Sequence, residues 1–466
     1  MTSHPPAAQR KIPRGFIYFF GAFGGILFGY DIGVMTGALP FLQHDWDLAG
    51  NAAAIGWITS SLMLGAVLGG ALSGQLSDRF GRRKMILVAA VIFAVGSFLC
   101  GISPDQGTIY LILVRVFLGL AVGAASALVP AYMSEMAPAE LRGRLSGLNQ
   151  TMIVSGMLLS YIMAWFLQHL PHNWAWRSML ALAAVPAIIL FIGVLRLPES
   201  PRFLVKNGLD DQARQVLSYI REPNQIEPEL AEIKKNAAEE QRANATSSWS
   251  MLFSGRYRYL VIAGVGVAAF QQFQGANAIF YYIPLIVEEA TGTAASDALL
   301  WPVIQGIILV AGSLVFLVIA DKFNRKTLLM VGGSVMAASF LLPAVINIVV
   351  ENANPMMIVV FLSIYVAFYS FTWAPLTWVL VGEVFPLLIR GRASGLASSF
   401  NWIGSFVVGL LFPIMTASMA QDAVFAIFGV ICVAGVIFVG TCVPETRGRT
   451  LEEIEAHGAK KGSAVR

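Results

Sequence analysis

The feature of this sequence that most constrains its fold is a series of twelve long apolar runs with charged residues between them. A helix needs about 20 apolar residues to cross the hydrocarbon layer of a bilayer, and each run is close to that length or longer. Hydrophobic residues make up 57% of the chain and charged residues 12%, with a mean hydropathy of +0.70. A soluble globule is only about half apolar. We therefore expect an all-α membrane protein with twelve transmembrane helices, and we exclude soluble enzymes and disordered chains.

The runs fall into two sets of six, separated by a polar interval that carries nine acidic and nine basic residues. This balance is typical of solvated helices and argues against a polybasic lipid-binding patch. Neither it nor the net charge of +4 points to nucleic acid. The predicted parts are a cytoplasmic tail (1–15), a six-helix bundle (16–198), a cytoplasmic helical linker (199–258), a second six-helix bundle (259–443) and a cytoplasmic tail (444–466).

The basic residues predict the orientation of the chain. Of the 31 Lys and Arg residues, 29 lie in the two tails, the linker and alternate loops, whereas the opposite loops hold only Arg177 together with eight acidic residues. Cytoplasmic loops of membrane proteins carry an excess of Lys and Arg. We therefore expect a multi-pass protein of the cell membrane with both termini in the cytoplasm.

Two charged residues lie inside apolar runs, Asp31 in the first and Arg115 in the fourth. Asp31 lies about 22 Å from the inner start of its run, at 1.5 Å per residue, and hence about 8 Å below the outer surface of a core about 30 Å thick. Arg115 lies about 10 Å below the same surface. The two are expected to meet. Because charges in hydrocarbon are costly, they are functional candidates, either as a site where a proton binds to Asp31 or as a static ion pair.

Three charged segments recur in the two halves at nearly constant offsets. EMAPAELRGRLSGL (135–148) matches EVFPLLIRGRASGL (383–396) at an offset of 248, DRFGRRK (78–84) matches DKFNRKT (321–327), and PESPR (198–202) matches PETRG (444–448). The repetition indicates a duplicated six-helix bundle. Many secondary transporters are built from such repeats, with their site at the interface between the halves.

The repeated segments lie in loops on the cytoplasmic side and mix acidic residues with arginines, which pair with carboxylates through two hydrogen bonds. We expect them to clip neighbouring helices together and to bias a conformational equilibrium toward an inner face that is closed. The alternative is that they only set the topology. The predicted gating residues are Asp78, Arg82, Glu135, Arg142, Glu199, Asp321, Glu383, Arg390 and Glu445.

The segments GQLSDRFGRRK, PAYMSEMAPAELRGR, PESPRFL, QQFQGANAIFYY and PETRGRT together resemble the sugar porter family of the major facilitator superfamily. The resemblance runs from Asp31 to Thr450 and implies twelve helices in two domains, a central monosaccharide site, and either proton symport or facilitated diffusion. It also implies that proton symporters carry an acid at the position of Asp31. Leu309 and Asn324 depart from the family pattern, in which Asn and Gly are common at these positions.

A sugar needs neutral hydrogen-bonding groups, and amide side chains both donate and accept. The resemblance places sugar contacts on amides and aromatic side chains within the spans: Gln150, Gln271, Gln272, Asn277, Asn401, Phe28, Tyr281, Trp378 and Trp402. We expect Gly275 to bend the seventh helix so that Gln271 and Asn277 face one cavity, and Pro375 to break the tenth helix near Trp378.

The sequence therefore favours a proton-coupled importer of a hexose or a pentose that works by alternating access. A proton-independent sugar facilitator, a porter for a polyol such as inositol, and a sugar sensor remain as alternatives. No nucleotide-binding loop or metal-ligand cluster is present to suggest an enzyme. We expect no cofactor or metal, with protons as the coupling ion, and a monomer whose partners are a sugar, a proton and the lipid bilayer.

Overall fold

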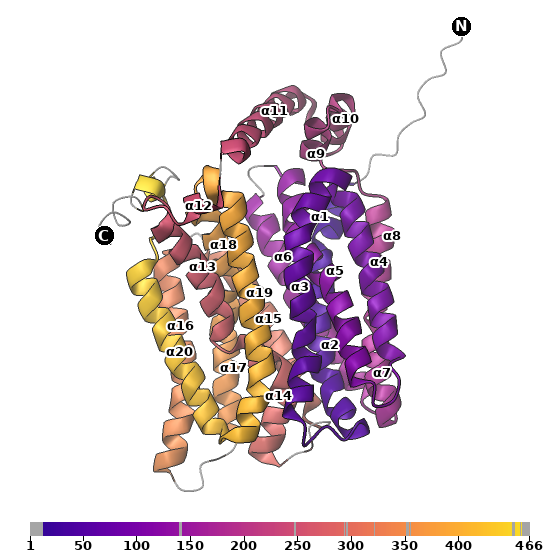
Figure 1. Cartoon of the computed structure of the whole chain (residues 1–466), viewed down its shortest axis with the longest axis vertical. Coiled ribbons are helices and arrows are strands. Elements are labelled where there is room, and N and C mark those ends of the chain that lie inside the picture. The colour runs from indigo at the N-terminus through magenta and orange to yellow at the C-terminus, as the bar shows by residue number, and fades with distance from the viewer. Residues whose placement is uncertain are drawn as a thin grey trace.

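The computed structural model describes residues 13–138, 142–246, 248–292, 294, 297–320, 322–350, 354, 356–449, 453–456 and 458, without the side chains of 142–147, 240–246, 297 and 387. The described part of the chain is helical and contains no strand. Two bundles of long helices stand side by side, and a group of shorter helices lies across one end of both (Figure 1). The expected all-α membrane fold is thus confirmed.

Six membrane-spanning segments form the first half, drawn from indigo to magenta in Figure 1. The first and sixth segments are each interrupted once, at Phe23 and at Ala183. In chain order the helices are α1 (Arg14–Ala22), α2 (Gly24–Asp45), α3 (Ala52–Phe80), α4 (Arg82–Gly101), α5 (Thr108–Met136), α6 (Arg142–Leu167), α7 (His172–Leu182) and α8 (Ala184–Leu195).

The second half, drawn in pink, orange and yellow, repeats this arrangement. Its helices are α13 (Arg258–Phe273), α14 (Ala276–Thr291), a short 3-10 helix η2 (Asp297–Leu299), α15 (Leu300–Ile319), α16 (Arg325–Val349), α17 (Met356–Phe371), α18 (Trp373–Val384), α19 (Leu387–Ser418) and α20 (Gln421–Cys442). Among the described residues, eleven segments are long and apolar enough to cross a membrane, including the first, sixth and tenth with their short interruptions. The seventh segment is not among them, because its interruption leaves two helices of fewer than 18 residues.

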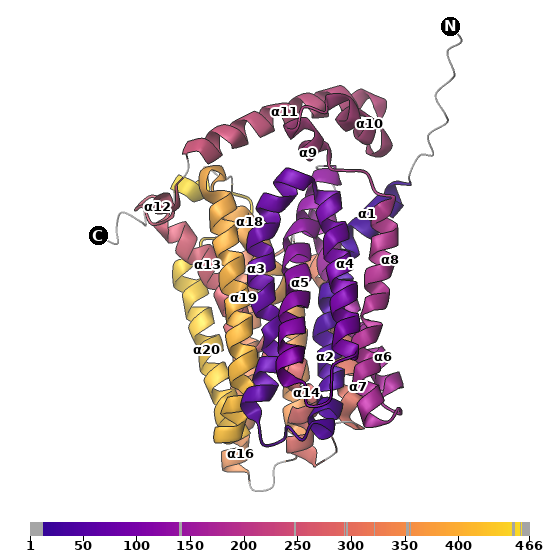
Figure 2. The ribbon, with the colours of Figure 1, turned by 45° about the vertical axis from the view of Figure 1, so that its right-hand side comes forward.

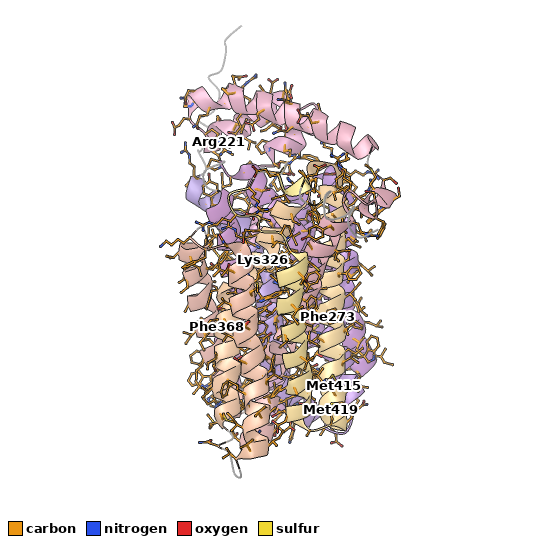
Figure 3. All side chains as sticks on the ribbon, turned by 90° about the vertical axis from the view of Figure 1, so that its left-hand side faces the viewer. Arg221, Phe273, Lys326, Phe368, Met415 and Met419 are labelled. Carbon is orange, nitrogen blue, oxygen red and sulfur yellow. The ribbon has the colours of Figure 1, made fainter. Side chains whose placement is uncertain are left out.

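The division of the seventh segment lies at Gly275, which has a φ of +91°. This left-handed conformation is easily adopted only by glycine, and a Cβ here would also press on the ring of Phe428. The break leaves two helices of 16 residues each, α13 and α14. In Figure 3 Phe273, the last residue of α13, lies at an intermediate height, between Lys326 near one end and Met415 and Met419 near the other. The predicted bend is therefore a complete interruption inside the bundle.

The tenth segment is interrupted at Thr372, between α17 and α18. Pro375 follows three residues later, and proline has no backbone N–H to donate to the carbonyl of residue i−4, here Phe371. The helical hydrogen bonding therefore stops just before Trp373 and starts again. Pro375 predicted a break in the tenth helix near Trp378. The interruption lies at Thr372, the residue before α18 begins.

The linker contains four helices, α9 (Pro201–Lys206), α10 (Asp210–Ile220), α11 (Pro223–Thr246) and α12 (Trp249–Leu252). Figure 2 shows α11 crossing the end of the molecule from the first half toward the second. Arg221 fastens the linker to the first half, because its Nη1 donates to the carbonyl of Met136, at the end of α5, over 3.1 Å. Its Nη2 donates to Glu229 on α11 over 2.7 Å. We call this end of the molecule the linker end.

Close helix packing in the first half determines where the charged spans meet. Gly65 and Gly69 on α3 lie against the backbone of α5, and Gly119 and Gly123 on α5 lie against the backbone of α3. A Cβ at any of the four would collide with a carbonyl of the other helix. Small residues allow membrane helices to approach in this way. The contact brings the part of α5 that carries Arg115 against α3, where Nη2 of Arg115 lies 3.4 Å from the carbonyl oxygen of Thr59.

One face of α19 shows how the two halves are spaced. Gly391, Gly395, Trp402 and Gly409 follow one another at intervals of four or seven residues, so they share a face. A Cβ at Gly409 would touch Ser60 of α3, and the ring of Trp402 contacts that of Phe28 on α2. A Cβ at Gly395 or Gly391 would meet no atom within 4 Å. The halves therefore touch away from the linker, and this face is open toward the linker end.

Candidate functional site

The two charged residues of the spans form a buried ion pair. Nη2 of Arg115, on α5, lies 3.5 Å from Oδ2 of Asp31, on α2. Their side chains are 0% and 2% exposed, so both charges are removed from water. Nε and Nη1 of Arg115 have no hydrogen-bond partner among the described residues. Breaking a buried pair leaves an uncompensated charge, which is strongly destabilising. A pair with so few supporting bonds is therefore sensitive to the protonation of its carboxylate.

Neutral amide side chains of α13, α14 and α19 form a connected cluster in the second half. Nδ2 of Asn401 donates to Oε1 of Gln271 over 2.7 Å. Nε2 of Gln272 donates to Oδ1 of Asn401 over 3.3 Å, and Nδ2 of Asn277 donates to Oε1 of Gln272 over 2.8 Å. We call these four residues the amide cluster. Four of the five predicted sugar-binding amides are thus brought together, because the break at Gly275 returns Asn277 to the side of Gln272.

Ser405 extends the amide cluster, since its hydroxyl contacts Nδ2 of Asn277. We did not predict this residue from the sequence. A signal was present, because Ser405 follows Asn401 by four residues and so lies on the same face of its helix. Serine is too common in membrane helices for that spacing to single it out.

The amide cluster also joins the two interrupted segments. Nε2 of Gln271 donates to the carbonyl oxygens of Trp373 and Ala374, over 3.1 Å and 2.9 Å, at the start of α18. The hydroxyl of Tyr365, on α17, donates to the carbonyl of Gln274 over 2.9 Å. Both interruptions are therefore held by side-chain bonds to buried backbone carbonyls, and the cluster lies where the helices can bend.

The predicted aromatic contacts take three different positions. Phe28 and Trp402 meet edge to face across the two halves, with ring centroids 5.2 Å apart. Trp378 is 42% exposed, on the side of α18 that is not packed. Tyr281 is fully buried, and its hydroxyl has no partner among the described residues.

Gln150, the fifth predicted amide, is half-buried on α6. In the part of the chain that the structure describes, it makes no bond to the amide cluster. It belongs to the first half, whereas the cluster is built from the second. A ligand of the amide cluster would therefore reach Gln150 only by bridging the two halves, and its role stays a prediction.

Glutamates of the repeated segments cap two helices at the linker end. Oε1 of Glu199 accepts the backbone N–H groups of Arg82 and Arg83, over 2.9 and 3.1 Å, at the start of α4. In the second half Glu445 accepts those of Arg325 and Lys326, over 3.0 and 3.1 Å, at the start of α16. The first N–H groups of a helix lack intrahelical partners and favour a negative charge. The two glutamates thus hold equivalent positions.

The residues before these two helices explain one departure from the family pattern. Gly81 has a φ of +98°, and a Cβ there would collide with the carboxylate of Glu199. Asn324, its counterpart, has a φ of −65°. This value suits any residue. The second half therefore forms the same glutamate cap without needing a glycine.

Glu135 and Glu383 also hold equivalent positions. Glu135 lies 3.3 Å from Nε of Arg82 and accepts the hydroxyl of Ser200. Glu383 lies 3.5 Å from Nη2 of Arg325 and accepts the hydroxyl of Thr446 over 2.6 Å. Each carboxylate thus joins the other two repeated segments of its own half. The contacts of Glu135 and of Glu383 therefore each lie within one half and do not join the two halves.

The remaining predicted gating residues have separate placements. Oδ1 of Asp78 lies 2.8 Å from Nη1 of Arg82, and Oδ2 of Asp78 lies 3.1 Å from Nζ of Lys206. Nε of Arg390 donates to the carbonyl of Phe385 over 3.1 Å. Asp321 and the side chain of Arg142 lie outside the described residues.

Comparison with known proteins adds to this geometry. The family model described as "Sugar (and other) transporter" matches residues 17–457. The D-xylose transporter of Levilactobacillus brevis is 42% identical over 452 residues, covering 96% of each chain. The glucose transporter GlcP of Staphylococcus epidermidis is 39% identical, covering 96% of this chain and 97% of that protein. The solved structure of the proton:xylose symporter XylE bound to 6-bromo-6-deoxy-D-glucose superposes with a TM-score of 0.81 at 30% identity. The match covers 95% of this chain and 98% of that chain.

Proposed function

This chain belongs to the sugar (and other) transporter family, and on that premise we propose that it imports a monosaccharide, a hexose or a pentose, together with a proton. It works by alternating access in the plasma membrane, as a monomer and without a cofactor. The observation that carries the proposal is the combination of a buried pair, Asp31 and Arg115, in the first half with a cluster of neutral amides in the second half.

The ion pair supports proton coupling. A carboxylate with 2% exposure is stable as an anion only while a cation faces it, here at 3.5 Å. If a conformational change separates Asp31 from Arg115, burial favours the neutral acid and a proton binds. Proton binding to Asp31 therefore depends on conformation, as a symporter requires. The similarity to a solved proton:xylose symporter points the same way.

The amide cluster supports a sugar as the substrate. Its four members are uncharged and offer both donors and acceptors, which match the hydroxyl groups of a sugar. Trp402 lies next to Asn401 and supplies an apolar face. A charged substrate would be left without a counter-ion in this cluster. Relatives named as transporters of D-xylose and of glucose support a monosaccharide of five or six carbons.

The distribution of basic residues supports a cytoplasmic linker end. Helix α1, the first described helix, lies on the linker side of the bundle in Figure 1. With this orientation, the open face at Gly391 and Gly395 points to the cytoplasm, and the contact of Gly409 with Ser60 closes the outer side. The structure then corresponds to an inward-open state.

Uptake of labelled sugars into proteoliposomes tests the proposal. A panel of pentoses, hexoses and inositol is offered with and without an imposed pH gradient. We expect one or more monosaccharides to accumulate above equilibrium only when the gradient is present. Equilibration without accumulation would indicate a facilitator, preference for inositol would indicate a polyol porter, and binding without flux would indicate a sensor.

Glu383→Gln is expected to shift the carrier toward the inward-open state. The Glu383 side chain is 36% exposed in this inward-open structure, so its contact with Arg325 gains strength only when the inner face closes and covers it. Removing the charge therefore costs the closed inner face about 1 kcal/mol or less, as for a partly exposed pair. A tenfold change in an equilibrium needs only 1.4 kcal/mol, so a balanced carrier responds measurably. The measurement is the labelling rate of a thiol at Gly395→Cys by a reagent added on the cytoplasmic side, with Cys442→Ser as background. We expect labelling to be faster than in the parent.

Asp211→Asn provides the matched control, because this carboxylate is 98% exposed on the linker. Its labelling rate should equal that of the parent. If Glu383→Gln is labelled no faster than the control at equal expression, the repeated segments serve as topology signals only.

A further inference from the structure

A series of polar contacts leads from the buried ion pair into the other half of the molecule. Nη2 of Arg115 lies 3.5 Å from Oδ2 of Asp31 and 3.4 Å from the carbonyl oxygen of Thr59. Both distances exceed the usual range for N–H···O bonds. The same nitrogen is thus shared between two acceptors, one on α2 and one on α3, and is bonded closely to neither.

The hydroxyl of Thr59 continues the series across the interface. It contacts the hydroxyl of Tyr282, on α14, which lies 2.7 Å from the carbonyl oxygen of Gly409, on α19. A tyrosine has one proton to donate. The Thr59 hydroxyl likewise has one proton, and it also lies 2.9 Å from the carbonyl oxygen of Ile55. One of the two hydroxyls therefore donates to the other, and the second bond of the pair goes to a backbone carbonyl, that of Gly409 or that of Ile55. We call the residues from Asp31 through Arg115, Thr59 and Tyr282 to Gly409 the coupling chain.

The coupling chain ends where the two halves touch. Gly409 lies against Ser60, the residue after Thr59, and Gly56, one turn earlier, lies against the carbonyl of Leu410. Thr59 and Tyr282 are 0% and 1% exposed. Their hydrogen bonds are therefore not replaced by water while this contact is closed, and a buried hydroxyl that loses its partner is costly.

We propose that Thr59 and Tyr282 are positioning residues that transmit the protonation state of Asp31 to the outer contact between the two halves. The inference rests on the proposed proton symport and names residues through which the coupling acts. Neither hydroxyl bonds to the amide cluster in the described contacts, so their role is separate from holding the sugar.

Nη2 of Arg115 is shared between Asp31 and Thr59, and this sharing explains how protonation of Asp31 affects Thr59. Hydrogen bonds to an ionised acceptor are about twice as strong as those to a neutral one. An ionised Asp31 therefore draws Nη2 of Arg115 toward α2 and away from Thr59. A proton on Asp31 removes this attraction, and Nη2 moves closer to the carbonyl of Thr59.

The direction of this effect suits a symport cycle. With Asp31 protonated, Arg115 fixes the residue whose hydroxyl bonds to Tyr282, so the outer contact stays closed while the sugar leaves to the cytoplasm. After the proton has left, Thr59 loses this support and the outer contact is released. The empty carrier can then return to its outward-facing state.

A double-mutant cycle on a reporter thiol tests the inference. Ser60→Cys, in a Cys442→Ser background, places a thiol in the outer contact, and the remaining cysteines, Cys100 and Cys432, are buried. An impermeant maleimide is added from the outer side at one fixed pH. Asp31→Asn imitates the protonated residue, and we expect it to slow labelling about fivefold, as for one hydrogen bond of ordinary strength.

In Tyr282→Phe and in Thr59→Val the same Asp31→Asn change is expected to alter labelling less than about twofold, since coupled residues give non-additive effects. Thr59→Ser keeps the hydroxyl and should restore the full effect. Tyr369→Phe removes a buried phenol from α17, outside the coupling chain, and should leave the full effect intact. Thr59→Val tests the same link should Tyr282→Phe not fold.

The inference is overturned if Asp31→Asn slows labelling equally in the presence and absence of the two hydroxyls, or if it has no effect on labelling in the parent. Proteoliposome uptake separates this result from failure of the proposed function. A parent that accumulates sugar with a pH gradient, but shows additive labelling effects, contradicts only the coupling chain. A parent that never accumulates sugar contradicts the proposed symport.

Discussion

Asp31→Asn is expected to abolish the accumulation of sugar driven by a pH gradient, while counterflow exchange of sugar continues. A gradient of about one pH unit supplies about 1.4 kcal/mol to a carrier that moves one proton with each sugar, which sustains about tenfold accumulation. Asparagine cannot take up or release a proton, but it keeps the size and hydrogen bonding of the aspartate. The accumulation ratio should therefore fall from about ten to about one.

The measurement compares radiolabelled uptake with and without the gradient in the same proteoliposomes. Asp47→Asn is the matched control, because Asp47 is exposed just beyond the end of α2. It should accumulate sugar like the parent. An Asp31→Asn variant that still concentrates sugar would show that the proton binds elsewhere and that the pair with Arg115 is only structural.

Gln271→Ala and Asn277→Ala are each expected to lower the affinity for sugar roughly 5- to 150-fold, which corresponds to about 1–3 kcal/mol for a polar group left without its partner. Gln271→Ala should have the larger effect. Its side chain also fastens α18, through the carbonyls of Trp373 and Ala374, and orients Asn401. The measurement is the apparent affinity in counterflow, with thermal stability followed in parallel.

Gln274→Ala serves as the control for these two variants. Gln274 lies in the same helix break, but its amide faces Gly435 on α20 and has no partner among the described residues. Its removal should leave sugar affinity within about twofold, because no ligand bond is lost. Unchanged affinity in both Gln271→Ala and Asn277→Ala would remove the amide cluster from the sugar site.

The sequence predicted those parts of the fold that depend on local composition. The lengths of the apolar runs and the positions of the charged residues were enough to predict the spans. The rise per residue of a helix placed Asp31 and Arg115 at similar depths in the membrane, and the structure brings these two residues together. The resemblance selected four amides that meet in one cluster. Helix geometry gave the reason, because Gly275 allows Asn277 to turn toward Gln272.

The partners of the repeated segments could not be predicted in the same way. Constant offsets showed that Glu199 and Glu445 are equivalent, but not that each caps a helix that begins more than a hundred residues earlier. Such a contact depends on the tertiary arrangement of six spans. The same holds for Thr59 and Tyr282, which are ordinary residues of apolar helices until the two halves are placed against each other.

The glutamate caps carry a consequence for the order in which the chain is made. Glu199 follows the sixth span by four residues, and it completes α4, whose first turn was synthesised long before. Protein chains emerge from the ribosome at about 5–20 residues per second, and domains fold as units with the N-terminal one first. The first bundle can therefore close its own cap before the second bundle has been translated. Glu445 gives the second bundle the same independence, so each half can be completed in the membrane without waiting for the other.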